Sequence, residues 1–269
     1  MIQVIDSIMG SGKSTWMISY INSHPEQQYL IVVPYLSEVN RYEVALENIK
    51  GFQPRNKHGG KISDFKELVA SGRNIVTTHA LLKNIDRECL NLLQVQNYNL
   101  ILDEAMQVIE EYHIPQSDLK ILDNEYIKIS DDGFVIWNNE NENAKEYKGK
   151  WAKEIRKYAE LNSLMAYQDS DKTPVKLIWN YPSNFFEYFN NIYILTYLWS
   201  GDIQEAYFKL HNIEYQHCSL INGKLSPYSK SNDIIERQKY KQLITVLDDK
   251  KLNQIGEREY KSKIPLSSS

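Results

Sequence analysis

The sequence has few cysteines and no long apolar run. Its 269 residues include two cysteines, Cys89 and Cys218, which lie far apart and outside any CxxC pattern. Neither a disulfide framework nor a cysteine-based metal site is therefore expected. No stretch approaches the ~18 consecutive apolar residues that a membrane-spanning helix needs, and residues 1–6 lack the basic and apolar segments of a signal peptide. These absences predict a reduced, cytoplasmic protein with no membrane partner.

A large excess of one charge is also missing. The net charge is −4, but residues 219–269 carry ten Lys or Arg against six Asp or Glu, which leaves −8 for residues 1–218. A basic tail is a weak indication of an anionic partner, and a solvated linker is the simpler interpretation. With 42% hydrophobic and 25% charged residues, the composition is typical of a globular protein.

Short apolar segments alternate with helical ones along residues 1–102, and one more apolar segment follows at residues 191–196. The predicted strands lie at residues 2–5, 29–33, 74–78, 98–102 and 191–196, and the predicted helices at 13–21, 35–50 and 62–70. Such alternation favours βαβ units and a mostly parallel sheet that is covered on both faces. The fold class expected is therefore α/β.

A different pattern interrupts this alternation at about residues 112–190. Residues 126–137 alternate around Asp131-Asp132-Gly133, which predicts a hairpin, and residues 145–165 predict one long charged helix. We interpret this part as a hairpin-and-helix insertion. One more strand is expected at 213–215. A boundary is expected after Cys218, with 219–269 as a connector or the start of an incomplete second domain.

A glycine-bearing loop, Ser7–Thr15, connects the first strand to the first helix. Its end, Gly-Ser-Gly-Lys-Ser-Thr, fits the phosphate-binding P-loop pattern, except that Ser7 replaces the first glycine. Such a loop presents backbone N–H groups and a helix N-terminus to phosphates, while the lysine contacts the β and γ phosphates and the serine contacts Mg²⁺. The residues expected to bind the nucleotide are Ser7, Met9, Gly10, Ser11, Gly12, Lys13, Ser14 and Thr15.

Two carboxylates, Asp103 and Glu104, end the strand predicted at residues 98–102. The carboxyl edge of a parallel sheet is where open α/β folds bind ligands. Asp103 would hold Mg²⁺ together with Ser14. Glu104 would act as the catalytic base for the attacking water, with Lys13 as the second catalytic residue.

These motifs resemble a known family. Asp103-Glu104-Ala105 resembles the DEA-type motif II of superfamily 2 helicases and translocases. Residues 32–38 are similar to their motif Ia, residues 75–79 to their TT/TH segment and residues 194–198 to their motif III. Helicase-like ATPases of bacteriophages and prophages also share a stretch similar to residues 200–208.

The resemblance implies a three-layer, RecA-like P-loop NTPase domain at residues 1–218, with ATP and Mg²⁺ as cofactors. By the same resemblance, Pro34, Thr78 and Thr196 would contact nucleic acid or couple it to the nucleotide. The partner implied is single-stranded or forked DNA, in phage replication or recombination within a bacterial host cell. The expected activity is ATP hydrolysis by a helicase- or translocase-like enzyme.

The sequence departs from this family in three ways. Only six residues precede Ser7, which leaves no room for an adenine-reading Q motif, and motif II continues with Met106. The family also needs a second lobe with an arginine finger, but the only arginines after Cys218 are Arg237 and Arg258. A protein partner or second subunit would then supply that arginine.

An alternative function follows from these departures. The chain would be a nucleotide-binding interaction module that regulates a protein partner, with little or no hydrolysis of its own. The sequence leaves open the choice between ATP and GTP and between DNA and RNA, and also the polarity and the oligomeric state.

Overall fold

The computed structural model describes residues 1–57, 59–241, 243 and 245. Met1–Ser229 form one compact unit and Lys230–Ser269 a second. The second unit contains helix α10 (Lys230–Lys241). The expected connector, residues 219–269, therefore lies partly outside the described residues.

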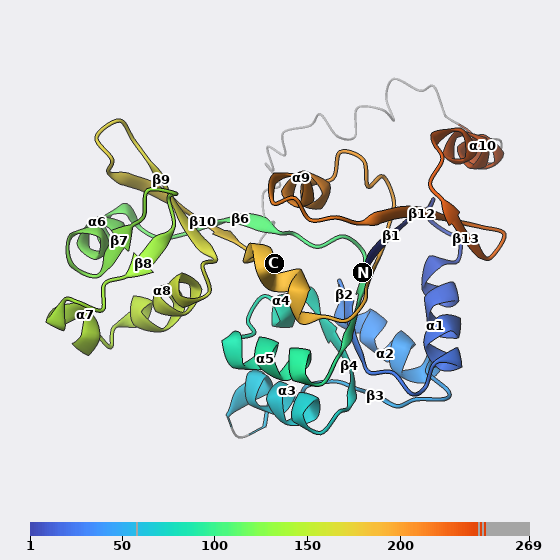
Figure 1. Cartoon of the computed structure of the whole chain (residues 1–269), viewed down its shortest axis with the longest axis horizontal. Helices are drawn as coiled ribbons and strands as arrows, with labels where there is room; N and C mark the ends of the chain where they lie inside the picture. The colour runs from blue at the N-terminus through green and yellow to red at the C-terminus, as the bar shows by residue number, and fades with distance from the viewer. Residues whose placement is uncertain (58, 242, 244, 246–269) are drawn as a thin grey trace, which may run out of the picture. The chain divides into compact units, whose positions relative to one another are not determined.

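An eight-stranded sheet forms the centre of the first unit (Figure 1). Its strand order is β13-β12-β1-β11-β5-β2-β4-β3, and the neighbours are parallel apart from the antiparallel pair β12–β13. The strands of this sheet are β1 (Ile2–Asp6), β2 (Tyr29–Val33), β3 (Gly51–Phe52), β4 (Asn74–Thr78), β5 (Asn99–Asp103), β11 (Ile192–Thr196), β12 (Gln216–Ile221) and β13 (Lys224–Pro227). The expected α/β fold with a mostly parallel sheet is thus confirmed.

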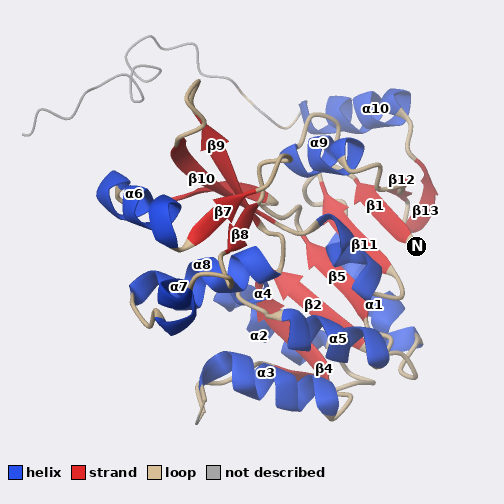
Figure 2. Ribbon diagram, turned by 60° about the vertical axis from the view of Figure 1, so that its left-hand side comes forward, coloured by secondary structure: helices blue, strands red, loops and turns tan. Residues whose placement is uncertain are grey.

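Helices cover both faces of this sheet (Figure 2). The helices that connect its strands are α1 (Lys13–Ser23), α2 (Leu36–Ala45), α3 (Gly60–Ala70), α4 (His79–Leu82), α5 (Arg87–Val95), the 3-10 helix η1 (Ser183–Tyr188) and α9 (Ile203–Leu210). Successive residues of a strand point to opposite faces, so β2 contributes Ile31 to one core cluster and Val32 to the other. The cluster with Ile31 contains α1 and α2, and the cluster with Val32 contains α3, α5 and α9. These layers are compatible with a three-layer α/β fold.

Three central strands of the main sheet are fully buried. Every residue of β2, β5 and β11 is buried, which explains their continuous apolar sequences. Strand β11 lies between β1 and β5, with Asp6 opposite Thr196 and Leu195 opposite Asp103. The ends of these three strands therefore lie side by side, although they are far apart in the sequence.

The insertion leaves the main sheet after β5 and ends before β11. It contains β6 (Ile109–Tyr112), α6 (Gln116–Glu125), β7 (Ile127–Ile129), β8 (Val135–Trp137), α7 (Glu142–Glu146), α8 (Lys150–Glu160), β9 (Leu164–Gln168) and β10 (Pro174–Asn180). Strands β6, β10 and β9 form a three-stranded sheet, and β7 pairs with β8. The expected hairpin around residues 131–133 is present, and its Gly133 adopts a φ of 83°, which glycine adopts without strain.

The prediction of a single long helix at residues 145–165 is wrong. The chain forms α7, then α8, and then strand β9, which pairs with β10. Asn162, with a φ of 53°, ends the helical run, and cross-strand pairing then overrides the helical propensity of the following residues. Helix α8 packs through Trp151, Ile155 and Tyr158, which are buried.

Two expectations near the end of the first unit also need correction. Residues 213–215 do not form a strand, because Ile213 N–H donates to Phe208 O and Asn212 has a φ of 53°. This is a left-handed helix C-cap. The boundary expected after Cys218 falls inside β12, which continues to Ile221 and pairs with β13. The compact unit extends to Ser229.

Candidate functional site

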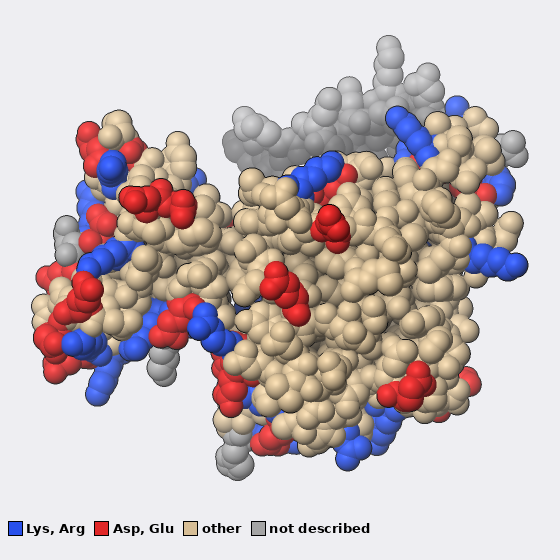
Figure 3. Space-filling view, in the orientation of Figure 1, with Lys and Arg blue, Asp and Glu red and all other residues tan. Residues whose placement is uncertain are grey.

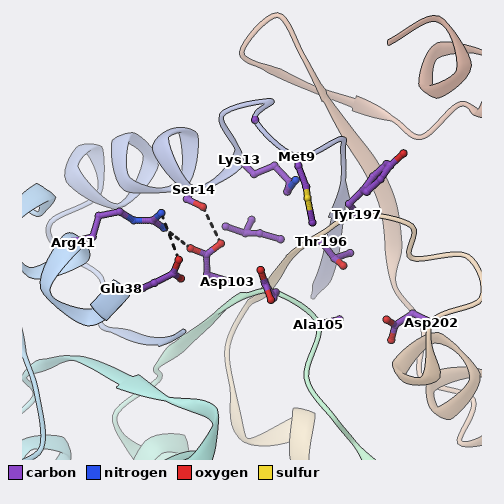
Figure 4. Close-up of a pocket in the computed structure, with 13 residues that line it drawn as sticks. Met9, Lys13, Ser14, Glu38, Arg41, Asp103, Ala105, Thr196, Tyr197 and Asp202 are labelled. Atoms are coloured by element: carbon purple, nitrogen blue, oxygen red, sulfur yellow. Dashed lines mark hydrogen bonds and ion pairs between the residues drawn. The ribbon is translucent and has the colours of Figure 1, made fainter. Parts of the chain in front are cut away.

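A cavity of about 410 Å³ lies at the carboxyl ends of β5 and β11, beside the loop between β1 and α1 (Figure 4). The loop and α1 contribute from one side and α2 from another, and the segment after β11 closes the opposite side. The lining residues are Met9, Gly10, Lys13, Ser14, Glu38, Arg41, Asp103, Glu104, Ala105, Leu195, Thr196, Tyr197 and Asp202. The cavity therefore brings together the two motifs that the sequence singled out.

The loop at Ser7–Gly12 requires glycine at two points because of its backbone. Gly10 has a φ of 78° and Gly12 a φ of 86°, and side chains other than glycine rarely adopt such angles. Gly12 is also the N-cap of α1, whose first turn contains no acidic residue. The first N–H groups of a helix lack intrahelical partners, and their partial positive charge favours an anion at this point.

The Lys13 ammonium lies inside this loop. Its Nζ donates to the carbonyl oxygens of Ser7 and Ile8, at 2.5 and 3.2 Å. Burial lowers the pKa of Lys13, and the nearby carboxylates, of which Asp103 has the largest effect, oppose this shift. The lysine is thus a partly desolvated cation whose partners are neutral carbonyl oxygens, which a charged phosphate could replace.

Asp103 is held by three donors from two helices. Ser14 Oγ donates to its Oδ1 at 2.9 Å, while Arg41 Nη2 and the Tyr42 hydroxyl donate to Oδ2 at 2.8 and 2.9 Å. Tyr42 is fully buried, whereas the Arg41 side chain is 48% exposed. Burial, followed by the charge of Asp103, raises the pKa of Tyr42, so its phenol stays protonated and fixes the carboxylate.

Glu104 stands in a strained position next to Asp103. Its φ is 108°, a region that favours glycine, and its N–H donates to Leu195 O at 3.0 Å. Partial desolvation raises the pKa of Glu104, as do the carboxylates of Glu38 and Asp103, against the opposing effect of Lys13. Backbone strain of this kind is often found at functional sites, and a raised pKa makes a carboxylate a better proton acceptor near neutrality.

The segment after β11 is fixed by Asp6, at the end of β1. The buried Asp6 carboxylate accepts from the N–H groups of Leu198 and Trp199 and lies 3.1 Å from His217 Nε2. Leu198 adopts a φ of 63° in this turn. Asp6 thereby positions the two residues that follow Tyr197, which lines the cavity.

The structure places the predicted residues unevenly around the cavity. Of the expected nucleotide-binding residues, Met9, Gly10, Lys13 and Ser14 line it, as do Asp103, Glu104 and Thr196. Ser7, Ser11, Gly12 and Thr15 belong to the same loop and helix start but are not among the lining residues. Pro34 follows β2 and Thr78 ends β4, at the same sheet edge but outside the cavity.

Sequence reasoning missed Glu38, Arg41 and Asp202 as lining residues and Asp6 and Tyr42 as positioning residues. The signal for Arg41 was its place three residues after Glu38 on a predicted helix, a spacing that puts both on one face. The ring of Tyr42 belongs to the apolar core. The position of its hydroxyl could not be read from helical periodicity.

The residues present fit a magnesium–nucleotide complex. Mg²⁺ prefers oxygen ligands and takes only one or two carboxylates when phosphates supply the rest, and the paired oxygens of Ser14 and Asp103 have this chemistry. The described residues contain no group of three or more His, Cys, Asp or Glu that could hold a metal unaided. The Ser11 hydroxyl, in the loop itself, is buried without a hydrogen-bond partner.

Charged side chains of both signs are interspersed over the insertion in the view of Figure 3, whereas the surface over the main sheet is mostly uncharged. In the described residues of this face, no continuous field of Lys and Arg is visible. Non-specific DNA binding depends on such basic surfaces, so this face gives no support to the expected DNA partner. Among the described helices, none combines the length and apolar composition that a membrane crossing requires.

Comparison with known proteins identifies a prophage relative. The chain is 34% identical over 272 residues to the SPbeta prophage-derived uncharacterized protein YonV of Bacillus subtilis (strain 168). The match covers 96% of this chain and 64% of the relative, so the chain spans less than two thirds of that protein. This homology supports a prophage origin.

The insertion matches a family model by itself. Residues 109–179 match the model described as the YonV middle domain, and this range runs from the first residue of β6 almost to the end of β10. No solved structure matches the chain. The insertion in the fold thus coincides with a segment that a family model describes by itself.

Proposed function

We propose that the chain binds a nucleoside triphosphate with Mg²⁺ in this cavity and hydrolyses its terminal phosphate. The observation that carries the proposal is the contact between Ser14 Oγ and Asp103 Oδ1 at 2.9 Å. It joins the end of the phosphate-binding loop to the acidic end of a buried strand, and P-loop NTPases hold Mg²⁺ with such a hydroxyl and carboxylate. The nucleotide we propose is ATP.

The loop, the start of α1 and the two carboxylates have distinct roles in this proposal. The N–H groups of Gly10, Gly12 and the first turn of α1 bind the phosphates, and Lys13 neutralises the β and γ phosphates. Mg²⁺, held by Ser14 and Asp103, supplies positive charge to the transferring phosphoryl group. Glu104 accepts the proton of the attacking water.

The hydrolysis step balances with these groups alone. The water oxygen forms a bond to the γ phosphorus, the bond from that phosphorus to the β–γ bridging oxygen breaks, and one water proton moves to Glu104. The products are the nucleoside diphosphate and inorganic phosphate. The raised pKa of Glu104 supports its role as the acceptor, because it brings the base closer to the operating pH.

The strand order supports a RecA-like P-loop fold as the finer architecture of residues 1–218. Strand β11 lies between β1, which leads into the loop, and β5, which ends in Asp103. This arrangement places Thr196 beside both motifs, where a residue could couple nucleotide state to another ligand. From the resemblance of the motifs to superfamily 2 helicases, we propose further a helicase- or translocase-like ATPase that acts on single-stranded or forked DNA in the host cytoplasm. The homology to a prophage protein supports only the phage setting, which we propose to be replication or recombination.

The second candidate is a nucleotide-dependent interaction module that regulates a protein partner and turns over slowly or not at all. The mixed charges on the face in Figure 3 favour a protein partner over DNA. In this case the cavity binds nucleotide as a switch, and a partner or second subunit supplies an arginine for hydrolysis. Nucleotide binding without turnover by the isolated chain would favour this candidate.

The test is steady-state hydrolysis of ATP by the purified chain with Mg²⁺, with and without single-stranded DNA. We expect Mg²⁺-dependent turnover that DNA raises, and loss of that turnover in Lys13→Ala and Glu104→Gln. The exposed residues Lys61 and Glu47 provide matched controls, and Lys61→Ala and Glu47→Gln should behave as the wild type. If the wild type neither binds nor hydrolyses Mg²⁺-nucleotide, the proposed function is wrong.

A further inference from the structure

Arg41 is one of only two cationic side chains among the described residues that line the cavity. The lining contains Lys13 and Arg41 against the four carboxylates of Glu38, Asp103, Glu104 and Asp202. A triphosphate is a polyanion, and such an acidic lining repels it. Every cation at this site therefore has a large effect on phosphate binding.

The position of Arg41 is set by α2 and by Asp103. Its Nη2 lies 2.8 Å from Asp103 Oδ2, and the other oxygen of the same carboxylate accepts from Ser14. The guanidinium thus lies at the end of the cavity where Ser14 and Asp103 meet. Figure 4 shows it reaching this point from α2, opposite Tyr197.

The guanidinium keeps capacity for another ligand. Arginine has five N–H donors in a planar fork. At this site Nη2 donates to Asp103, Nη1 approaches Glu38 at 3.9 Å, and Cζ lies 5.3 Å from the centroid of the Tyr42 ring. The side chain is 48% exposed, so it lies within reach of a ligand that enters the cavity from solvent.

The Asp103 carboxylate does not need Arg41 to hold its position. The buried phenol and the Ser14 hydroxyl each hold one oxygen of Asp103. A structural role for Arg41 would therefore duplicate what its neighbour already does. A phosphate, by contrast, can accept two parallel bonds from the arginine fork.

We propose that Arg41 is a phosphate-binding residue of this chain that recognises the terminal phosphate of a bound nucleoside triphosphate. The arginine that the sequence led us to expect from a second lobe or subunit is then supplied from within the domain. The inference rests on the proposed function and adds to it a residue that discriminates triphosphate from diphosphate. It also makes Arg41 a source of positive charge for the transferring phosphoryl group.

The test is equilibrium binding of two fluorescent probes in Mg²⁺, a non-hydrolysable ATP analogue and ADP, to the wild type, Arg41→Ala and Arg41→Lys. We expect Arg41→Ala to weaken binding of the triphosphate analogue about 10- to 100-fold, as for loss of a charge-assisted pair of hydrogen bonds. ADP affinity should change less than about threefold. Arg41→Lys should be intermediate, because lysine restores the charge without the fork.

Arg156→Ala is the matched control. Like Arg41, Arg156 is an arginine on a helix that pairs with a carboxylate. Its partner is Glu160, at 3.0 Å on the same helix, α8, which lies in the insertion and not at the cavity. It should leave both affinities unchanged. Turnover of ATP should fall by ~10³-fold or more in Arg41→Ala and stay unchanged in Arg156→Ala.

The outcomes separate this inference from the proposed function. A wild type that binds neither probe overturns both. If the wild type binds both probes and Arg41→Ala weakens them equally or not at all, the proposed function stands and the role of Arg41 is overturned. Tighter binding of the triphosphate analogue by Arg41→Ala would also overturn it, because Arg41 would then act as a competitor of Mg²⁺ for Asp103.

Discussion

The Ser14 hydroxyl donates to Asp103 Oδ1 at 2.9 Å across 89 positions of sequence. Ser14 follows β1 and Asp103 ends β5, and β11 lies between these two strands. The parallel register, in which Asp6 is opposite Thr196 and Leu195 is opposite Asp103, aligns the ends of the three strands. The sheet therefore sets the distance between the two halves of the candidate site. This contact is the first to test.

Ser14→Ala should abolish most Mg²⁺-dependent turnover, by about 10²-fold or more, because one oxygen ligand of the metal is lost. The measurement is the rate of phosphate release as a function of Mg²⁺ concentration. Ser23→Ala, at the far end of the same helix, is the control, because its exposed hydroxyl contacts only the neighbouring Tyr20 carbonyl and His24 ring, away from the cavity. Equal rates in Ser14→Ala and the wild type would exclude Ser14 as a metal ligand.

Ser7 should contribute to stability and not to nucleotide affinity. Its Oγ accepts from Leu220 N–H at 2.7 Å, and both residues are buried. Ser7→Ala leaves that N–H without its acceptor, which costs about 1–2 kcal/mol of unfolding free energy. The measurement is the urea midpoint together with nucleotide affinity, and the surface substitution Ser71→Ala is the control. A large loss of affinity at unchanged stability would instead make Ser7 part of the binding site.

Glu104→Gln should stabilise the fold slightly at neutral pH. The pKa of Glu104 is raised in the folded chain, chiefly by desolvation, so the folded state binds more protons than the unfolded state and stability falls as pH rises through the folded pKa. Because Glu104 is largely exposed, the gain is only a few tenths of a kcal/mol. It should vanish below about pH 4.5, near the unfolded pKa. Urea unfolding of both forms from pH 4 to 8, with Glu47→Gln as control, tests the sign.

His79 should make the fold less stable in mild acid. Burial lowers the pKa of His79 to about 4, against the opposing charge of Asp103, and its Nε2 is buried without a hydrogen-bond partner. The unfolded chain therefore takes up the proton first, so stability is complete above about pH 6.5 and falls by on the order of 3 kcal/mol towards pH 4.

His79→Gln provides the test of that slope. Glutamine does not titrate, so the variant should show a flatter dependence of unfolding free energy on pH between 6.5 and 4, whatever its absolute stability. His113→Gln, at a side chain that is 88% exposed, should keep the slope of the wild type. A slope unchanged in His79→Gln would assign the acid sensitivity to other groups.

The parallel sheet could be predicted from the sequence, and so could the positions of the loop and of the two carboxylates at the sheet edge. Buried parallel strands such as β2 and β5 are continuous apolar runs, and the loop and carboxylates follow directly from them. Prediction failed at residues 145–165, where strand β9 exists because β10 lies beside it. Helical periodicity in the sequence contains no information about such a partner.

The site residues that the sequence did not predict were missed for the same reason. Arg41 and Tyr42 reach Asp103 from α2, a helix that the sequence predicted without indicating which of its polar atoms would meet β5. Asp6 binds Leu198 N–H from 192 positions away. Such contacts depend on the strand order, which a single sequence does not specify.

The position of β1 in the sheet has a consequence for how the chain folds. Its two neighbours are β11 and β12, so β1 can pair only after synthesis has reached β11, with Ile2 opposite Ile192. Contacts of such long sequence separation form slowly, because loop closure precedes the stabilising contacts. The phosphate-binding loop is therefore among the last parts to be fixed in place, and a nascent or truncated chain that ends before β11 has no ordered site.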